Sequence, residues 1–404
     1  MTDQRSATSD GEEHVPQPTA AMRRKVVGLA TAAAVGGFLF GFDSSVINGA
    51  VDSIQHHFAL NAFVTGFIVA VALLGCAVGA YLAGRLADRW GRIRVMLIGA
   101  VLFLASSIGA GLSFSVWDLG FWRIIGGLGI GIASVVAPAY IAEIAPKQRR
   151  GGLASLQQLA ITVGIFVALL SDALLAGAAG AAANQLWLGL EAWRWMFLVG
   201  VIPSLVYGIL ALVLPESPRY LLATGRHDQA RAIFVTLVPE EDVDRQVRDI
   251  EQAIEQDKDA AKGTLRGNRF GLKPIVWIGI ILSVFQQFVG INVIFYYSTT
   301  LWKAVGFTES NSLLITVITS VTNVVVTIVA ILLVDRVGRR PILLTGSVGM
   351  AMSLGVMALA FSFASKTGGE VSLPNPWGPI ALVAANLFVI FFGASWGPLV
   401  WVLL

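Results

Sequence analysis

The chain has 404 residues, of which 56% are hydrophobic and only 13% are charged. This composition is far from that of soluble domains and predicts a membrane protein. The net charge of +3 does not indicate nucleic-acid binding, because the basic residues are spread over separate loops and form no single face.

Apolar runs of about 20 residues, enough to cross roughly 30 Å of hydrocarbon, predict ten transmembrane helices. These runs lie at 26–47, 63–83, 95–115, 119–142, 153–175, 193–214, 274–301, 312–334, 342–364 and 378–404. Residues 1–25 are polar and are expected to form a disordered cytoplasmic tail. A cleaved signal peptide is the alternative for the first run, but its length and the many later spans argue against it.

A charge inside a membrane span costs about 2.5–3.5 kcal/mol on insertion scales, so Asp43 and Arg123 stand out as candidate functional residues. Asp43 lies in the first span and Arg123 in the fourth, at compatible depths. They are predicted to pair when Asp43 is ionised and to separate when it is protonated. The alternative is that Asp43 caps the outer end of its helix or meets interfacial water.

Lys and Arg gather in alternate loops, so the positive-inside rule places those loops and the N-terminus in the cytoplasm. One of these loops, residues 215–273, separates six spans from four. It carries Val247, Ile250 and Ile254 at helical spacing on a charged background. This spacing predicts short amphipathic helices, and a solvated linker is an equally good interpretation.

The segments DRWGR at 88–92 and DRVGRRP at 335–341 occupy the same place between the second and third spans of each half. Such parallel repeats predict a duplicated bundle, with one copy at 26–214 and the other at 274–404. A full second copy would have six spans, but the sequence ends inside its fourth. We therefore expect a truncated second bundle, unless the natural protein has only ten spans.

Side-chain amides gather in FQQFVGINVIFYYS at 285–298, which carries Gln286, Gln287 and Asn292. In an unbroken helix Asn292 would point about 120–140° away from the two glutamines, so a break at Gly290 is predicted to turn all three to one site. The other amides and aromatic residues expected at this site are Gln158, Asn323, Tyr296, Trp396 and Trp401. Amides beside aromatic rings suit a neutral polyhydroxylated ligand. The alternative is that the amides only join helices.

Other patterns argue against catalysis and nucleotide binding. The four histidines and the single cysteine, Cys76, have no metal-ligand spacing, and the spans contain no paired nucleophile and base, so we expect no enzyme activity. The glycines of RIIGGLGIG at 123–131 follow no strand and lack nucleotide-loop spacing. They are expected to allow close helix packing.

In these motifs the chain resembles the sugar porters of the major facilitator superfamily, which include bacterial proton-coupled sugar symporters and animal facilitative glucose carriers. The resemblance covers residues 26–404 and is carried by GFDSSVING, GRLADRWGR, RIIGGLGIGIASVVAPAYIAEIAPKQRRG, PESPRYLL, FQQFVGINVIFYYS, VDRVGRRP and SWGPLVWVLL. It implies an all-α membrane protein with the major facilitator fold. That fold has two six-helix bundles around a central cavity, with cytoplasmic helices between them, and it works by alternating access.

The resemblance also implies roles for individual residues. Sugar hydroxyls are expected to bind Gln158, Gln286, Gln287, Asn292 and Asn323, in a cavity also lined by Phe40, Tyr296, Trp396 and Trp401. Asp43 is the expected proton-coupling carboxylate and Arg123 its partner. A cytoplasmic gate that latches the outward-facing state is expected from Asp88, Arg92, Glu143, Arg150, Glu216, Asp335 and Arg339. The chain departs from the family pattern in two places, since it reads GRIR at 91–94 and has Ile331 where a glycine usually opens the second loop motif.

The predicted function is import of a monosaccharide, a hexose or a pentose, with a proton across the cell (cytoplasmic) membrane. The proton is the coupling ion, and no other cofactor, nucleic acid or second subunit is expected beside the sugar and the lipid bilayer. A facilitative uniporter, a polyol or inositol transporter and a sugar sensor on the same scaffold are the alternatives. Glucose, xylose, galactose and inositol differ by single hydroxyls that the same amides serve, and the expectation concerns the full-length protein.

Overall fold

The computed structural model describes residues 19–146, 150–260, 273–367 and 370–403. Within these residues, ten helical segments are long and apolar enough to cross a membrane, and they coincide with the ten predicted runs. The first is longer than its apolar run, because the helix extends from Ala20 to His57.

The first bundle contains six spans built from seven helices. They are α1 (Ala20–His57), α2 (Ala62–Trp90), α3 (Arg92–Gly111), α4 (Val116–Ile144), α5 (Arg150–Ala179), α6 (Ala192–Val199) and α7 (Val201–Val213). The sixth span is interrupted at Gly200, three residues before Pro203, which has no N–H to offer the preceding turn.

The segment between the bundles forms three helices, α8 (Pro218–Ala223), α9 (His227–Leu237) and α10 (Glu240–Ala260). Val247, Ile250 and Ile254 of α10 pack against a small buried cluster that includes Leu221 and Phe234. The predicted amphipathic helices are therefore confirmed, and the solvated-linker interpretation is wrong.

Four spans of the second bundle lie within the described residues. They are built from α11 (Pro274–Phe288), α12 (Ile291–Ala304), α13 (Glu309–Val337), α14 (Arg339–Ser362), α15 (Trp377–Ala394) and α16 (Trp396–Leu403). A short antiparallel ribbon of β1 (Ser365–Thr367) and β2 (Glu370–Ser372) joins α14 to α15. The tenth span is interrupted at Ser395, a break that the hydropathy pattern does not reveal.

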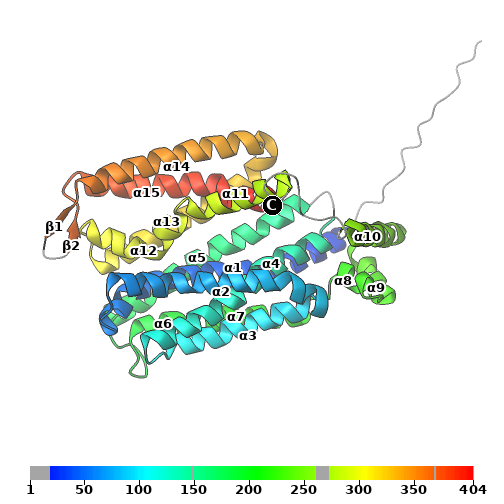
Figure 1. The fold of residues 1–404 in the computed structure, drawn as a ribbon, viewed down its shortest axis with the longest axis horizontal. Helices are drawn as coiled ribbons and strands as arrows, with labels where there is room; N and C mark the ends of the chain where they lie inside the picture. Colours follow the sequence, from blue (N-terminus) through cyan, green and yellow to red (C-terminus); the bar gives the residue numbers. More distant parts are fainter. Residues whose placement is uncertain (1–18, 147–149, 261–272, 368–369, 404) are drawn as a thin grey trace, which may run out of the picture.

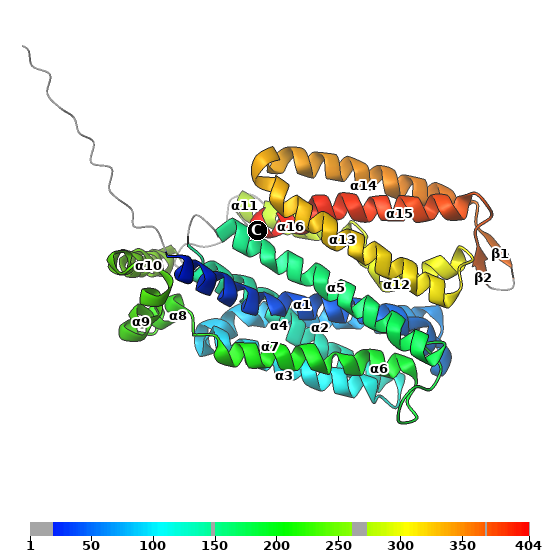
Figure 2. The same cartoon turned by 180° about the vertical axis from the view of Figure 1, so that it is seen from behind.

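The two bundles lie side by side with their long helices running in the same general direction (Figure 1). In both views α8, α9 and α10 lie at one end of the molecule and the β1–β2 ribbon at the other, and we call these the α10 end and the β1 end (Figures 1 and 2). Helix α5 lies along the boundary, where it packs against α1 of the first bundle and α13 of the second.

Close packing inside the first bundle depends on glycines of α4. A Cβ atom added at Gly127 would lie 2.1 Å from the carbonyl oxygen of Ala72, and one added at Gly131 would lie 2.2 Å from that of Cys76. Helix α4 therefore contacts the backbone of α2 directly, which confirms the packing interpretation of RIIGGLGIG.

Gly127→Ala should destabilise the first bundle, because its methyl group would push α4 away from α2 at a cost of about 1–3 kcal/mol. Thermal unfolding of the detergent-solubilised protein would show a lower Tm. Gly84→Ala on α2 is the matched control, since nothing lies within 4 Å of an added Cβ there. A Tm for Gly127→Ala equal to that of the wild type would contradict this account of the packing.

Candidate functional site

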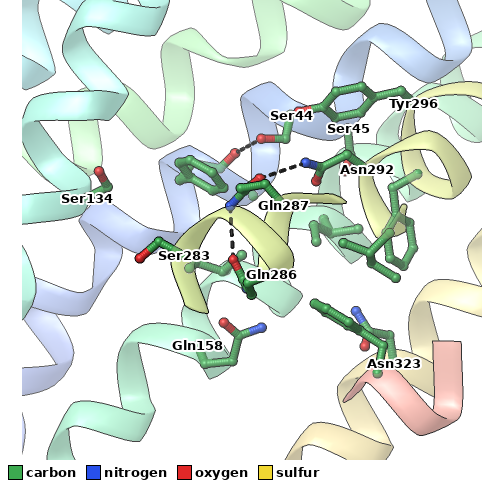
Figure 3. A pocket seen from close by; sticks show the side chains of 17 residues that line it. Ser44, Ser45, Ser134, Gln158, Ser283, Gln286, Gln287, Asn292, Tyr296 and Asn323 are labelled. Carbon is green, nitrogen blue, oxygen red and sulfur yellow. Dashed lines mark hydrogen bonds between the residues drawn. The ribbon is translucent and has the colours of Figure 1, made fainter. Parts of the chain in front are cut away.

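A cavity of about 300 Å³ lies between the two bundles and is lined by residues of α1, α4, α5, α11, α12, α13 and α15. Its amide side chains are Gln158, Gln286, Gln287, Asn292 and Asn323, and its aromatic side chains include Phe40 and Tyr296. Seven of the residues predicted to contact a ligand thus meet at one cavity (Figure 3).

The seventh span is broken at the predicted position. Helix α11 ends at Phe288 and α12 begins at Ile291, with Gly290 between them in the left-handed region at φ +95°. Glycine adopts this conformation without the steric cost of a side chain. The prediction of a break at Gly290 is confirmed, and the helical residues on either side of the break, including Gln287 and Ile291, line the cavity.

The break arranges the three amides in a hydrogen-bonded chain (Figure 3). Asn292 Nδ2 donates to Gln287 Oε1 at 3.1 Å, and Gln287 Nε2 donates to Gln286 Oε1 at 3.0 Å. Each amide is oriented by its neighbour, while the Gln286 amino group and the Asn292 carbonyl oxygen are left at the two ends of the chain. Those ends can donate to and accept from a ligand hydroxyl.

The opposite walls add groups from other helices. Gln158 comes from α5 and Asn323 from α13, and the Asn323 carbonyl oxygen is buried without a hydrogen-bond partner among the described residues. Sequence reasoning missed the hydroxyl groups of Ser44, Ser45, Ser134 and Ser283, which also line the cavity. Serine is common in membrane helices, so only its position beside Asp43 or the glutamines could have drawn attention to it.

Two predicted aromatic residues are not placed at the cavity. Trp396 lies in a separate groove beside α11 and α14, where its indole Nε1 donates to Ser347 Oγ at 2.8 Å. The break at Ser395 begins a new helix at Trp396, so its direction could not be derived from a continuous span. The Trp401 side chain lies outside the described residues.

Asp43 and Arg123 form the predicted pair. Arg123 Nη1 donates to Asp43 Oδ1 at 3.0 Å, and both side chains are buried, with exposed fractions of 3% for Arg123 and 8% for Asp43. Helix α1 continues from Asp43 to His57, so the alternative that Asp43 caps a helix end is wrong. Ser44 and Ser45 follow Asp43 directly and line the cavity, so the ion pair is one residue along α1 from the cavity wall, although neither Asp43 nor Arg123 lines the cavity itself.

The bundles are joined at the β1 end by contacts that the sequence did not suggest. Asn48 Nδ2 donates to the carbonyl oxygen of Phe295 and to Ser298 Oγ, both at 2.8 Å, and Asn48 Oδ1 accepts from the Thr299 hydroxyl. One turn further along α1, Lys303 Nζ contacts Asp52 Oδ2 at 2.8 Å. Helices α1 and α12 are therefore held together at this end.

At the α10 end, three residues of the predicted gate are in contact within the first bundle. Arg92 makes two bonds to Glu143, with Nη2 to Oε1 at 2.8 Å and Nε to Oε2 at 3.1 Å, and it also contacts Asp88 at 3.1 Å. Glu216 instead accepts from the backbone N–H of Arg92 at 2.9 Å, which caps the start of α3.

The other predicted gate residues make no contribution that can be described. Arg339 begins α14 and is exposed. The side chains of Arg150 and Asp335 lie outside the described residues.

The family model described as "Sugar (and other) transporter" matches residues 29–404. The chain is 53% identical over 390 residues to the glucose transport protein of Synechocystis sp., covering 96% of this chain and 83% of that one. It is 36% identical to the D-xylose-proton symporter of Escherichia coli, covering 94% of this chain and 79% of that one.

Solved structures of sugar transporters are also similar to this chain in fold. The partially occluded inward open conformation of the xylose transporter XylE from E. coli matches with a TM-score of 0.80 at 33% identity, covering 94% of this chain and 86% of that one. The major facilitator superfamily proton:xylose symporter XylE bound to 6-bromo-6-deoxy-D-glucose matches with a TM-score of 0.81 at 35% identity, covering 94% and 82%.

Asn48→Ala should open the β1 end, because each buried hydrogen bond left unmade costs about 1–3 kcal/mol. In a Cys76→Ser background, spin labels at the exposed His56 and Ser310 would measure the distance between the bundles by pulsed EPR. We expect a larger share of long distances. Thr322→Ala, which removes a hydroxyl bonded within its own helix, is the control. An unchanged distance distribution for Asn48→Ala would show that Asn48 does not hold this end closed.

Proposed function

The chain belongs to the sugar (and other) transporter family and has the major facilitator fold, and from this premise we propose that it imports a monosaccharide together with a proton. The observation that carries the proposal is the buried Asp43–Arg123 pair beside an amide-lined cavity. A protonatable group at this position links the charge of the protein to the occupancy of the cavity.

The cavity chemistry supports a neutral sugar as the substrate. Its volume of about 300 Å³ is at the lower end of the range for small-molecule sites. Amides supply a donor and an acceptor together, as neighbouring sugar hydroxyls require, and Phe40 and Tyr296 offer ring faces. Relatives named for glucose, D-xylose and arabinose support hexoses first and pentoses second.

The proposed orientation places the α10 end and the N-terminus in the cytoplasm. Arg85, Arg89, Arg92 and Arg94 lie where α2 and α3 meet at that end, as the positive-inside rule requires. The β1 end then faces outward, and the Asn48 and Lys303 contacts close the outer side of the cavity. The described state has its outer end closed.

In the proposed cycle, a proton from outside binds Asp43 and weakens its pair with Arg123. Sugar then binds the amides, and the bundles close at the outer end through Asn48 and Lys303. After the sugar leaves to the cytoplasm, Asp43 releases its proton and pairs again with Arg123. The 3.0 Å contact in the structure suits this last state, with the carboxylate ionised.

We further propose that a set of weak cytoplasmic contacts latches the outward-facing state. Its members are Asp88, Arg92, Glu143, Arg150, Glu216, Asp335 and Arg339. Several weak pairs suit a contact that must break in every cycle. Glu216 contributes by holding the start of α3, which positions Arg92 against Glu143. In this proposal the protein works as a monomer in the cell membrane, with the proton as its coupling ion.

Asp43→Asn should abolish proton-driven accumulation while exchange of sugar for sugar survives, because a neutral amide carries no proton but leaves the cavity intact. Uptake of radiolabelled sugar in energised vesicles would stop at the external concentration, and counterflow would continue. Asp228→Asn, at an exposed position of α9, is the matched control and should accumulate sugar normally. Accumulation above the external concentration by Asp43→Asn would remove Asp43 from the coupling mechanism.

Gln287→Ala should weaken sugar binding strongly, since Gln287 is the central member of the amide chain and orients both neighbours. A loss of about 1–3 kcal/mol corresponds to a Kd about 5- to 150-fold higher. Isothermal titration calorimetry of the purified protein measures this directly, with the exposed Gln229→Ala on α9 as the control. An unchanged Kd would show that the amide chain is not part of the sugar site.

A further inference from the structure

A second carboxyl group is buried inside the first bundle and has no role in the cycle above. Asp172 of α5 has an exposed fraction of 0%. Its Oδ2 accepts a hydrogen bond from the backbone N–H of Gly49 on α1 at 3.3 Å, and its Oδ1 is buried without a partner among the described residues. A Cβ added at Gly49 would lie 2.7 Å from the Asp172 Cβ, so no room is left for solvent on that side.

No cation balances this carboxyl group in the described part of the chain. The elements packed against α5 are α1, α4, α6, α13 and α16, with α12 in the same buried cluster as part of α5, and α16 contains no charged residue. The charged residues of the other five helices include Asp43, Asp52, Arg123, Arg194, Lys303 and Glu309. Each of them is engaged elsewhere: Asp43 with Arg123, Asp52 and Glu309 with Lys303, and Arg194 with Glu191.

Asp172 must therefore be neutral while the β1 end is closed. An ionised carboxylate with one backbone hydrogen bond and no cation would cost several kcal/mol at this depth. A protonated carboxyl group avoids that cost and can donate its own O–H. Asp43 differs because Arg123 supports its ionised form.

Asp172 also lies next to the contacts that close the β1 end. Gly49 directly follows Asn48, which bonds to α12. On α5, Leu169 and Ala173 near Asp172 belong to the same hydrophobic cluster as Phe295 and Trp302 of α12. Separation of α12 from α1 and α5 would open this shared cluster, and water from the β1 end could then reach the carboxyl group.

We propose that Asp172 is an external proton-binding site that gates closure of the β1 end and is separate from the transported proton. A proton from outside water must bind the Asp172 carboxylate before the bundles close, and it returns to the same side when they reopen. No net proton crosses the membrane through this group, because the proton enters from the β1 end and returns to it. The proposal rests on the proposed function and on the orientation given there.

The test uses Asp43→Asn, in which the coupling carboxylate is absent, so that any remaining pH dependence reports on another group. Counterflow of radiolabelled glucose or xylose is measured in right-side-out vesicles while external pH rises from about 6 to 8.5 at constant internal pH. With one gating proton, the exchange rate should fall by up to about tenfold per pH unit at high external pH. The Asp43→Asn, Asp172→Asn double variant should keep its low-pH rate throughout. Changing internal pH alone should alter neither variant.

Asp172→Ser is a smaller second variant that also cannot titrate, and it should remove the same external pH dependence. Persistence of that dependence in both double variants would overturn the proposal, as would a flat profile for Asp43→Asn itself. Loss of exchange by a well-folded Asp172→Asn would also overturn it, because a neutral side chain is expected to close normally. Absence of exchange by the wild-type protein with any sugar would instead reject the proposed function, and the gating proposal with it.

Discussion

The ion pair between Asp43 and Arg123 is the interaction on which the account of this protein depends. Each charge alone would be expensive in the middle of a membrane protein, and together they support each other at 3.0 Å between α1 and α4. The pair is sensitive to one proton, because neutralising Asp43 removes the reason for Arg123 to stay beside it. Its position next to Ser44 and Ser45 connects this change in charge to the cavity.

The cavity follows from a second constraint, that non-helical backbone at membrane depth must be covered by protein or face a polar space. Gly290 interrupts the seventh span at a point where α11 and α12 meet the cavity, and the interruption turns three amides toward one another. The same broken span carries Ser298, Thr299 and Lys303, which meet α1 at the β1 end. The amides that we propose bind the sugar and the contacts that join the bundles are thus on one broken span, which couples binding to closure in the proposed cycle.

Features that depend on local pattern were predictable from the sequence. Hydropathy located all ten spans, and helical geometry together with Gly290 predicted the break that gathers Gln286, Gln287 and Asn292. Features that depend on contacts between distant helices were not. Asn48 looks like any polar residue of a membrane helix until Phe295 and Ser298 are placed opposite it. Asp172 was missed although it is a charged residue in a span, and Trp396 could not be placed without the break at Ser395.

The most direct test of the central claim is the external pH of a lightly buffered suspension of de-energised cells that express the protein, recorded as glucose, xylose, galactose or inositol is added. If sugar and proton enter together through Asp43, one of these sugars will cause a transient alkalinisation, and Asp43→Asn will abolish it. Entry of the radiolabelled sugar with no pH change would contradict proton coupling and identify the protein as a uniporter.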